Sequence, residues 1–165
     1  MASKKGIALT ASIAVAVVGG SFLIWFIPQT NNPSSVLVTS SQTDEERISD
    51  VYSRHNDIAA NVDSKYNQWK RGNATTNELL SLIDRERSEI QNMRTELIKP
   101  KPAQEWQQSF DIYIKALDSY TRYIDTLETK VQMGNKTNLD PELNSQRQEW
   151  QGFVNDSANA IPINK

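Results

Sequence analysis

The sequence predicts an all-α protein, in which a single N-terminal transmembrane helix precedes an extracytoplasmic, antiparallel up-down helical bundle of three long helices and a shorter fourth. Two observations support this prediction. Residues 7–27 contain 16 apolar residues among 21 and no charge, whereas only 44 of the 138 residues from Pro28 onward are apolar. In that second part the apolar residues recur at alternating spacings of three and four, which places one apolar stripe on each helix.

The composition excludes several kinds of chemistry. The 165 residues include no Cys and one His, so we expect no disulfide, iron–sulfur cluster, thiol nucleophile or multi-His metal centre. A net charge of −2 gives no reason to expect nucleic-acid binding. The chain also contains no Gly-rich phosphate loop and no HExxH, GxSxG or SxxK motif. We therefore predict a protein that is not an enzyme and that needs no cofactor.

Residues 7–27 are predicted to be a transmembrane anchor. A helix rises about 1.5 Å per residue, so this run matches a hydrocarbon core of about 30 Å. Lys4 and Lys5 lie directly before it, and the next charged residue is Asp44. By the positive-inside rule, residues 1–6 are then cytoplasmic and the bundle lies outside the cell membrane.

Small residues in the anchor suggest two further properties. The segment Gly19–Ser21 could be cleaved by a signal peptidase, so a cleaved signal is an alternative to the anchor. Small side chains at four-residue spacing would also allow a second membrane helix to approach closely. This predicted helix-pairing face consists of Ala8, Ser12, Ala16 and Gly20.

The dipeptide Lys5-Gly6, followed directly by an apolar run, resembles the processing site of archaeal type IV pilins and archaellins. In those proteins a peptidase cleaves after the glycine, and the apolar helix then packs in a filament core. The resemblance covers the first 27 residues, and Ala11 stands where many type IV pilins carry a glutamate near the start of the run. It implies a filament subunit whose mature chain begins at Ile7.

Residues 28–42 have two prolines and no charge, which predicts an extended linker between anchor and bundle. The bundle is expected to span residues 43–161. Its first two helices open with capping boxes that begin at Thr43 and Thr75, and an Asp-Pro pair at 140–141 opens the fourth. The expected helices cover about 43–71, 76–98, 102–133 and 141–159.

Polar residues interrupt the predicted apolar stripes at three positions. His55 lies on the stripe of the first helix at the level of Met93, with Trp106 close by, and is either a satisfied core residue or a pH sensor. Lys65 and Glu86 interrupt facing stripes within about one helical turn of each other. Such a pair commonly fixes the register of two helices, although it can also mark a ligand site.

Aromatic residues at seven-residue spacing are typical of a core, but they could also line a pocket for an aromatic or cationic ligand. The full set of candidate ligand or polar-core positions is His55, Lys65, Glu86, Trp106, Tyr113 and Tyr120. Three Asn-x-Ser/Thr tripeptides are candidate N-glycosylation sites, at Asn73, Asn135 and Asn155.

These observations lead us to expect a non-enzymatic, single-pass surface protein that acts as an interaction scaffold or as an accessory subunit of a membrane complex. Its expected partners are the lipid bilayer, through residues 7–27, and another protein or a second copy of the chain. One alternative is a sensor-like bundle that binds a small ligand. Another is a pilin-like filament subunit processed after Gly6.

Overall fold

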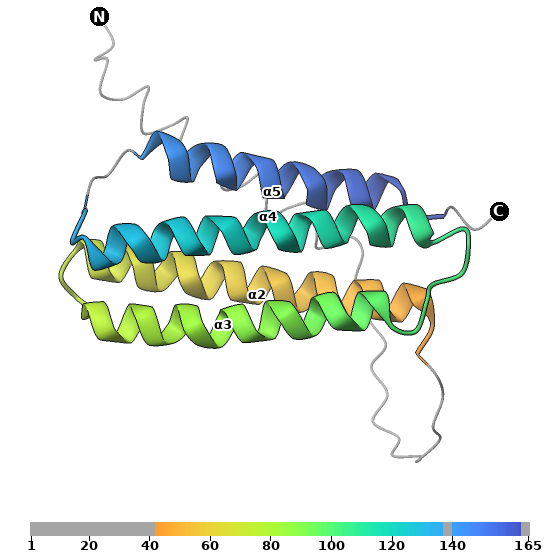
Figure 1. Cartoon of the computed structure of the whole chain (residues 1–165), viewed down its shortest axis with the longest axis horizontal. Coiled ribbons are helices and arrows are strands. Elements are labelled where there is room, and N and C mark those ends of the chain that lie inside the picture. The colour runs from red at the N-terminus through yellow and green to blue at the C-terminus, as the bar shows by residue number, and fades with distance from the viewer. Residues whose placement is uncertain (1–41, 137–139, 163–165) are drawn as a thin grey trace, which may run out of the picture. The chain divides into compact units, whose positions relative to one another are not determined.

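The computed structural model describes residues 42–136 and 140–162, which form four α-helices and contain no strand. The helices are α2 (Asp44–Lys70), α3 (Thr76–Ile98), α4 (Gln107–Gln132) and α5 (Pro141–Asn159). They lie side by side and alternate in direction along the chain (Figure 1). The predicted all-helical fold is therefore confirmed.

The predicted anchor, its helix-pairing face, the processing site after Gly6 and residues 28–41 of the linker lie outside the described residues. Within 42–136 and 140–162, none of the helices combines the length and the apolar character that a membrane crossing requires.

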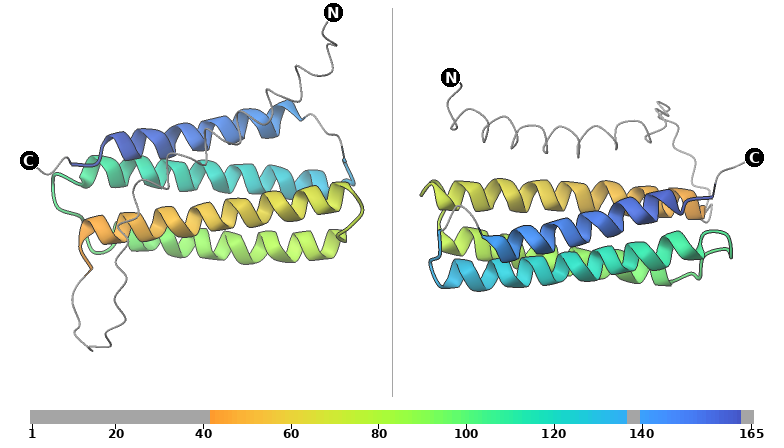
Figure 2. Two further views of the ribbon diagram at one scale, coloured as in Figure 1. Left: turned by 180° about the vertical axis from the view of Figure 1, so that it is seen from behind. Right: turned by 90° about the horizontal axis from the view of Figure 1, so that it is seen from above.

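The four helices close into a ring, because the last helix also contacts the first. Helix α3 packs between α2 and α4, and α4 packs against α5. Hydrogen bonds join α5 back to α2: the Tyr52 hydroxyl donates to Ser157 Oγ at 2.7 Å, and Arg147 donates to both Asp63 carboxylate oxygens. The two further views agree with this closed arrangement (Figure 2).

The helices begin where the capping residues are predicted. Thr43 Oγ1 accepts from the Glu46 amide at 3.2 Å, and the Glu46 carboxylate accepts from the Thr43 amide at 2.8 Å. Thr75 and Glu78 repeat this reciprocal pattern at the start of α3. These bonds satisfy amides that have no partner inside a helix. Gly72 takes a φ of +79° in the turn after α2, a conformation that costs other residues more.

Helix α4 begins at Gln107, five residues later than the expected start near residue 102. Trp106 precedes it without a side-chain cap. The connection before α4 is held to the first turn of α2 instead, since the Ala103 amide donates to Asp44 Oδ2 at 2.8 Å. Arg47 donates to the Pro100 carbonyl at 2.7 Å. Residues 100–103 are thus held against α2, and α4 starts only after them.

Large side chains fill the seam between the helices. Helix α4 contributes seven residues, at spacings of three and four, that are at most 1% exposed, namely Phe110, Tyr113, Leu117, Tyr120, Ile124, Leu127 and Val131. Trp106, four residues before this series, is half-buried. Helix α5 buries only Leu143, Trp150 and Ser157. Ser157 donates to the Ser109 carbonyl at 2.8 Å, and Ser109 donates to the Ser157 carbonyl at 2.9 Å. Small buried serines therefore let α4 and α5 approach closely.

Replacing the first capping residue of α3 (Thr75→Ala) is expected to lower the free energy of unfolding by about 1 kcal/mol, because the Glu78 amide loses its acceptor. Urea unfolding of the full chain, followed by circular dichroism, measures this loss. Ser53→Ala, at an exposed position inside α2, is the control and should change stability by less than about 0.5 kcal/mol. Equal losses in the two variants would contradict the capping role.

Candidate functional site: a polar groove between α2 and α3

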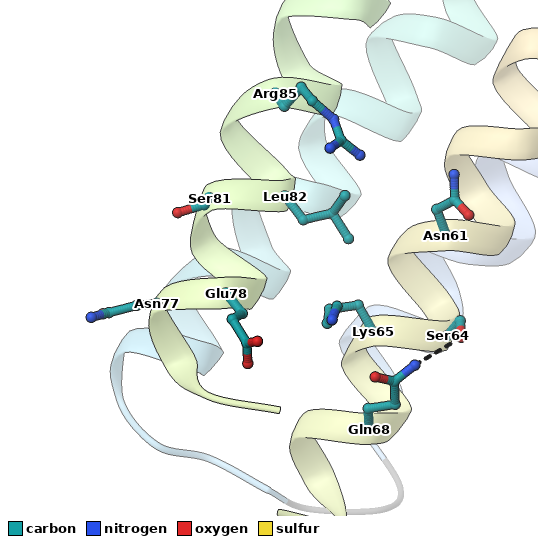
Figure 3. A pocket seen from close by; sticks show the side chains of 9 residues that line it. All are labelled: Asn61, Ser64, Lys65, Gln68, Asn77, Glu78, Ser81, Leu82 and Arg85. Carbon is teal, nitrogen blue, oxygen red and sulfur yellow. Dashed lines mark hydrogen bonds between the residues drawn. The ribbon is translucent and has the colours of Figure 1, made fainter. Parts of the chain in front are cut away.

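An open groove of about 680 Å³ lies between the last third of α2 and the first half of α3 (Figure 3). Its walls are polar side chains from both helices, with one leucine among them. The lining residues are Asn61, Ser64, Lys65, Gln68, Asn77, Glu78, Ser81, Leu82 and Arg85. The groove is near the α2–α3 turn, at the end of the bundle opposite to residue 42, where the chain enters α2 (Figure 1).

Two cations face the groove, one from each helix. Lys65 extends from α2 and Arg85 from α3, and both point toward the gap (Figure 3). The Arg85 side chain is 69% exposed and forms an ion pair with its neighbour Glu86. Both bonded nitrogens, Nε and Nη2, donate to the same Glu86 oxygen, so Nη1 keeps its donors. Within 42–136 and 140–162, Lys65 makes neither a hydrogen bond nor an ion pair.

A carboxylate and an apolar side chain complete the groove. The Glu78 carboxylate accepts from the Thr75 amide at 2.7 Å and from the Thr75 hydroxyl at 3.0 Å. These two bonds lower the pKa of Glu78, and the nearby Lys65 ammonium lowers it further, so this carboxylate is ionised and already engaged. Leu82 is half-buried, packs against the core and points into the gap (Figure 3).

The structure does not form the expected pair between Lys65 and Glu86. Glu86 is buried as predicted, at 5% exposure, but its ion pair is with Arg85 on the same helix. Lys65 is half-buried, and the residue after it, Tyr66, occupies the stripe of α2 at 7% exposure. A straight helix has 3.6 residues per turn and drifts away from a strict seven-residue repeat. That drift moves Lys65 off the stripe and into the groove.

His55 lies at the centre of an aromatic cluster contributed by three helices. Its side chain is 2% exposed, and Nδ1 lies 2.9 Å from the Tyr113 hydroxyl. The imidazole packs edge-on against the ring of Tyr120 at 4.7 Å between centroids, and in a tilted arrangement against the ring of Trp150 at 5.3 Å. Trp106 lies two helical turns before Tyr113, about 10 Å along α4. The tryptophan beside His55 is therefore Trp150, and not Trp106 as expected.

Burial sets the protonation states in this aromatic cluster. It lowers the pKa of His55 to about 3 and raises the pKa values of Tyr113 and Tyr120 above their ordinary range. His55 Nε2, the Tyr120 hydroxyl and Trp150 Nε1 have no hydrogen-bond partner in the part of the chain that the structure describes. All three side chains are neutral at neutral pH, and the two tyrosine rings are at most 1% exposed. The cluster is therefore part of the packed core, although its three unpaired polar atoms depart from the usual pairing of buried polar groups.

The sequence analysis missed several polar contacts between helices. Arg147 of α5 donates to the Asp63 carboxylate and to the Tyr123 hydroxyl, which joins three helices. Arg47, at 8% exposure, donates to the carbonyl of Glu96 at 2.6 Å. Their sequence signal was weak, because charged residues on an amphipathic helix usually face solvent. The residues of the groove also had a weak sequence signal, and only Lys65 among them was a candidate position from the sequence.

The three glycosylation candidates occupy different settings. Asn73 is exposed in the α2–α3 turn, and Asn155 is exposed on α5. The serine of the Asn155 tripeptide is Ser157, whose hydroxyl is buried and bonded to Ser109. Asn135 is exposed after α4, while the threonine of its tripeptide lies outside the described residues. The exposed turn at Asn73 is thus the most accessible of the three.

The described residues contain no group of three or more His, Asp or Glu side chains that could hold a metal ion. A scan of protein-family models and searches of curated proteins and of solved structures find no match to this chain.

Acid should destabilise the bundle through His55. The pKa of His55 in the folded chain lies below its unfolded value of about 6.5. As the pH falls below about 6.5, the unfolded chain therefore binds more protons than the folded chain. The stabilising contribution is present above about pH 6.5 and is lost progressively toward pH 3. Between about pH 7.5 and about pH 5, the free energy of unfolding falls by about 2 kcal/mol through this residue.

The His55→Phe variant isolates this contribution, because phenylalanine cannot take up a proton. Chemical unfolding at both pH values should show the natural chain losing about 2 kcal/mol more than the variant. Carboxylate titration affects both proteins alike. The lost bond to Tyr113 lowers the stability of the variant at each pH and cancels in the difference. Identical pH dependence in the two proteins would contradict a neutral, buried His55.

Proposed function

We propose that this chain is a membrane-anchored, extracytoplasmic helical bundle without enzymatic activity, which binds a protein partner as a scaffold or as an accessory subunit of a membrane complex. The apolar run at residues 7–27 and the two lysines before it support the anchor and its orientation. The bundle would then present its side chains to partners outside the cell membrane.

The contrast between a packed interior and an open groove carries this proposal. A bundle that holds a small ligand needs a cavity between its helices, usually apolar and largely enclosed. Tyr113 and Tyr120, the candidates for lining such a cavity, are each 1% exposed and in contact with neighbouring rings. The groove instead lies on the surface, is polar, and is open to a large partner. These observations favour a protein partner over the small-ligand alternative.

The position of the groove agrees with such a role. It lies beyond residue 61 of α2, and at about 1.5 Å per residue this is roughly 25 Å along the bundle from the start of that helix at Asp44. The groove is open to solvent, so a partner in solution or on another protein can reach it.

Protection from protease tests the sidedness of the bundle. An epitope tag at the C-terminus should be digested when protease is added to intact cells, because the positive-inside rule places the bundle outside. A tag placed before Lys4 should be digested only after lysis. A C-terminal tag that resists protease in intact cells would contradict the extracytoplasmic location.

Cross-linking in intact cells, followed by mild detergent extraction, tests whether the bundle has a partner. The full chain should be recovered in a complex larger than its 18.7 kDa monomer. A control chain that retains residues 1–41 and the tag but lacks the bundle should be recovered without the partner. Recovery of the full chain as a monomer alone would contradict the proposed function.

Mass spectrometry of the mature N-terminus separates a plain anchor from pilin-type processing. Because the all-helical bundle differs from the β-rich head domains of the pilins that Lys5-Gly6 resembles, we expect the chain to retain Lys4 and Lys5. A mature chain that begins at Ile7 would instead support a filament subunit.

A further inference from the structure

We propose that the groove between α2 and α3 binds an acidic polypeptide segment in an extended conformation, with its carboxylates at Lys65 and Arg85 and an apolar side chain on Leu82. The inference rests on the proposed partner-binding function and names the chemistry of the partner. Three features of the groove support it: the way its cations are paired with carboxylates, the hydrogen-bond donors that these cations keep, and the single apolar side chain in its lining.

The cations of the groove differ from Arg54 in how far carboxylates satisfy them. Arg54 of α2 forms ion pairs with Glu89 and Glu96 of α3. In the groove, Lys65 of α2 acts on the Glu78 carboxylate of α3 only through space, and Arg85 of α3 pairs with Glu86 on its own helix. The carboxylates of a partner would therefore find free hydrogen-bond donors at each cation.

The carboxylates already present do not use up these cations. The Glu86 side chain is 7% exposed and lies below the surface, where its carboxylate accepts hydrogen bonds from Nε and Nη2 of Arg85. Glu78 is engaged by the Thr75 amide and hydroxyl, and its interaction with Lys65 is through space, without an ion pair within 4.0 Å in the described ranges. The three Lys65 donors and Arg85 Nη1 therefore remain for a ligand.

The remaining lining favours a polypeptide over a simple anion. Asn61 and Gln68 present side-chain amides, which can pair with the N–H and C=O groups of an extended backbone. Leu82 lies between the two cations and offers the only apolar side chain of the lining. An acidic segment with interspersed apolar residues satisfies all three kinds of contact, whereas inorganic phosphate or a sulfated polysaccharide leaves Leu82 without a partner.

Fluorescence anisotropy with the full chain in phosphatidylcholine nanodiscs tests this inference. The probe is a fluorescein-labelled peptide of Glu-Ser-Leu repeats, which we expect to bind saturably and more weakly as salt rises. The double variant Lys65→Glu/Arg85→Glu should lower the affinity about tenfold or more. The matched double variant Lys101→Glu/Lys115→Glu makes the same charge change at exposed positions outside the groove and should change the affinity less than about twofold.

Two further comparisons identify what the groove recognises. A Gln-Ser-Leu peptide should not bind, because it lacks the carboxylates. Leu82→Ala should weaken binding of the Glu-Ser-Leu peptide and leave binding of a Glu-Ser-Ser peptide unchanged. Circular dichroism and thermal unfolding check that each variant is folded, and Lys65→Gln/Arg85→Gln serves in case charge reversal disturbs the helices.

Three outcomes would overturn the inference. The first is that the Glu-Ser-Leu peptide does not bind saturably, and the second is that the two double variants lose affinity equally. The third is that heparin displaces the peptide and itself binds equally well to the natural chain and to Leu82→Ala. This test is separate from that of the proposed function. A chain that is monomeric in cells but binds the peptide would contradict the partner-binding function alone. A chain that recovers a partner in cells but does not bind the peptide would contradict the assignment of the groove alone.

Discussion

The bundle depends on hydrogen bonds that buried aromatic side chains make across helices. Only 44 of the 138 residues after the apolar run are apolar, so tyrosine and tryptophan supply much of the buried volume. A buried hydroxyl or indole N–H needs a partner, since an unmade hydrogen bond costs about 1–3 kcal/mol. The partners come from other helices, so each bond fixes the register of two helices. Tyr113 pairs with His55, and Tyr52 pairs with Ser157. Tyr123 pairs with both Asp63 and Arg147. Tyr120 and Trp150 lack such partners in the described residues, which is consistent with a modestly stable fold.

Arginines reinforce the same register at the surface. At least one arginine–carboxylate contact bridges each neighbouring pair of helices around the ring. Examples are Arg54–Glu89 between α2 and α3, Arg94–Asp118 between α3 and α4, Arg122–Glu149 between α4 and α5, and Arg147–Asp63 between α5 and α2. Exposed pairs of this kind contribute little individually, but each disfavours a shifted register. Against this background, Lys65 and Arg85 stand out, because in the described residues neither forms an ion pair with a carboxylate of the facing helix.

The sequence predicted the helices well because the signals are local. Capping residues determine where α2, α3 and α5 start, and the three-and-four spacing indicates which face each helix buries. Helix α4, which has no side-chain cap, is the one whose start was misplaced. The site was harder to predict. Lys65 and Tyr66 are adjacent, and a strict seven-residue repeat selects the lysine for the stripe, whereas the actual pitch of the helix selects the tyrosine. The groove also depends on the alignment of two helices, so its residues looked like ordinary solvent-facing positions. The contact between Arg147 and Asp63 spans 84 positions and left no local pattern.

The rigid core and the exposed groove are connected by the turn that joins α2 to α3. Trp69, 2% exposed, lies one residue before the end of α2 and donates to Thr76 Oγ1 at the start of α3, which Thr75 caps through Glu78. These bonds hold the two walls of the groove at a fixed separation before any partner arrives. A preformed site loses little conformational entropy on binding, so even a few exposed charges and one leucine can contribute to affinity. Hydrogen bonds at the turn between α2 and α3 thus keep the groove in the arrangement that the proposed partner would need.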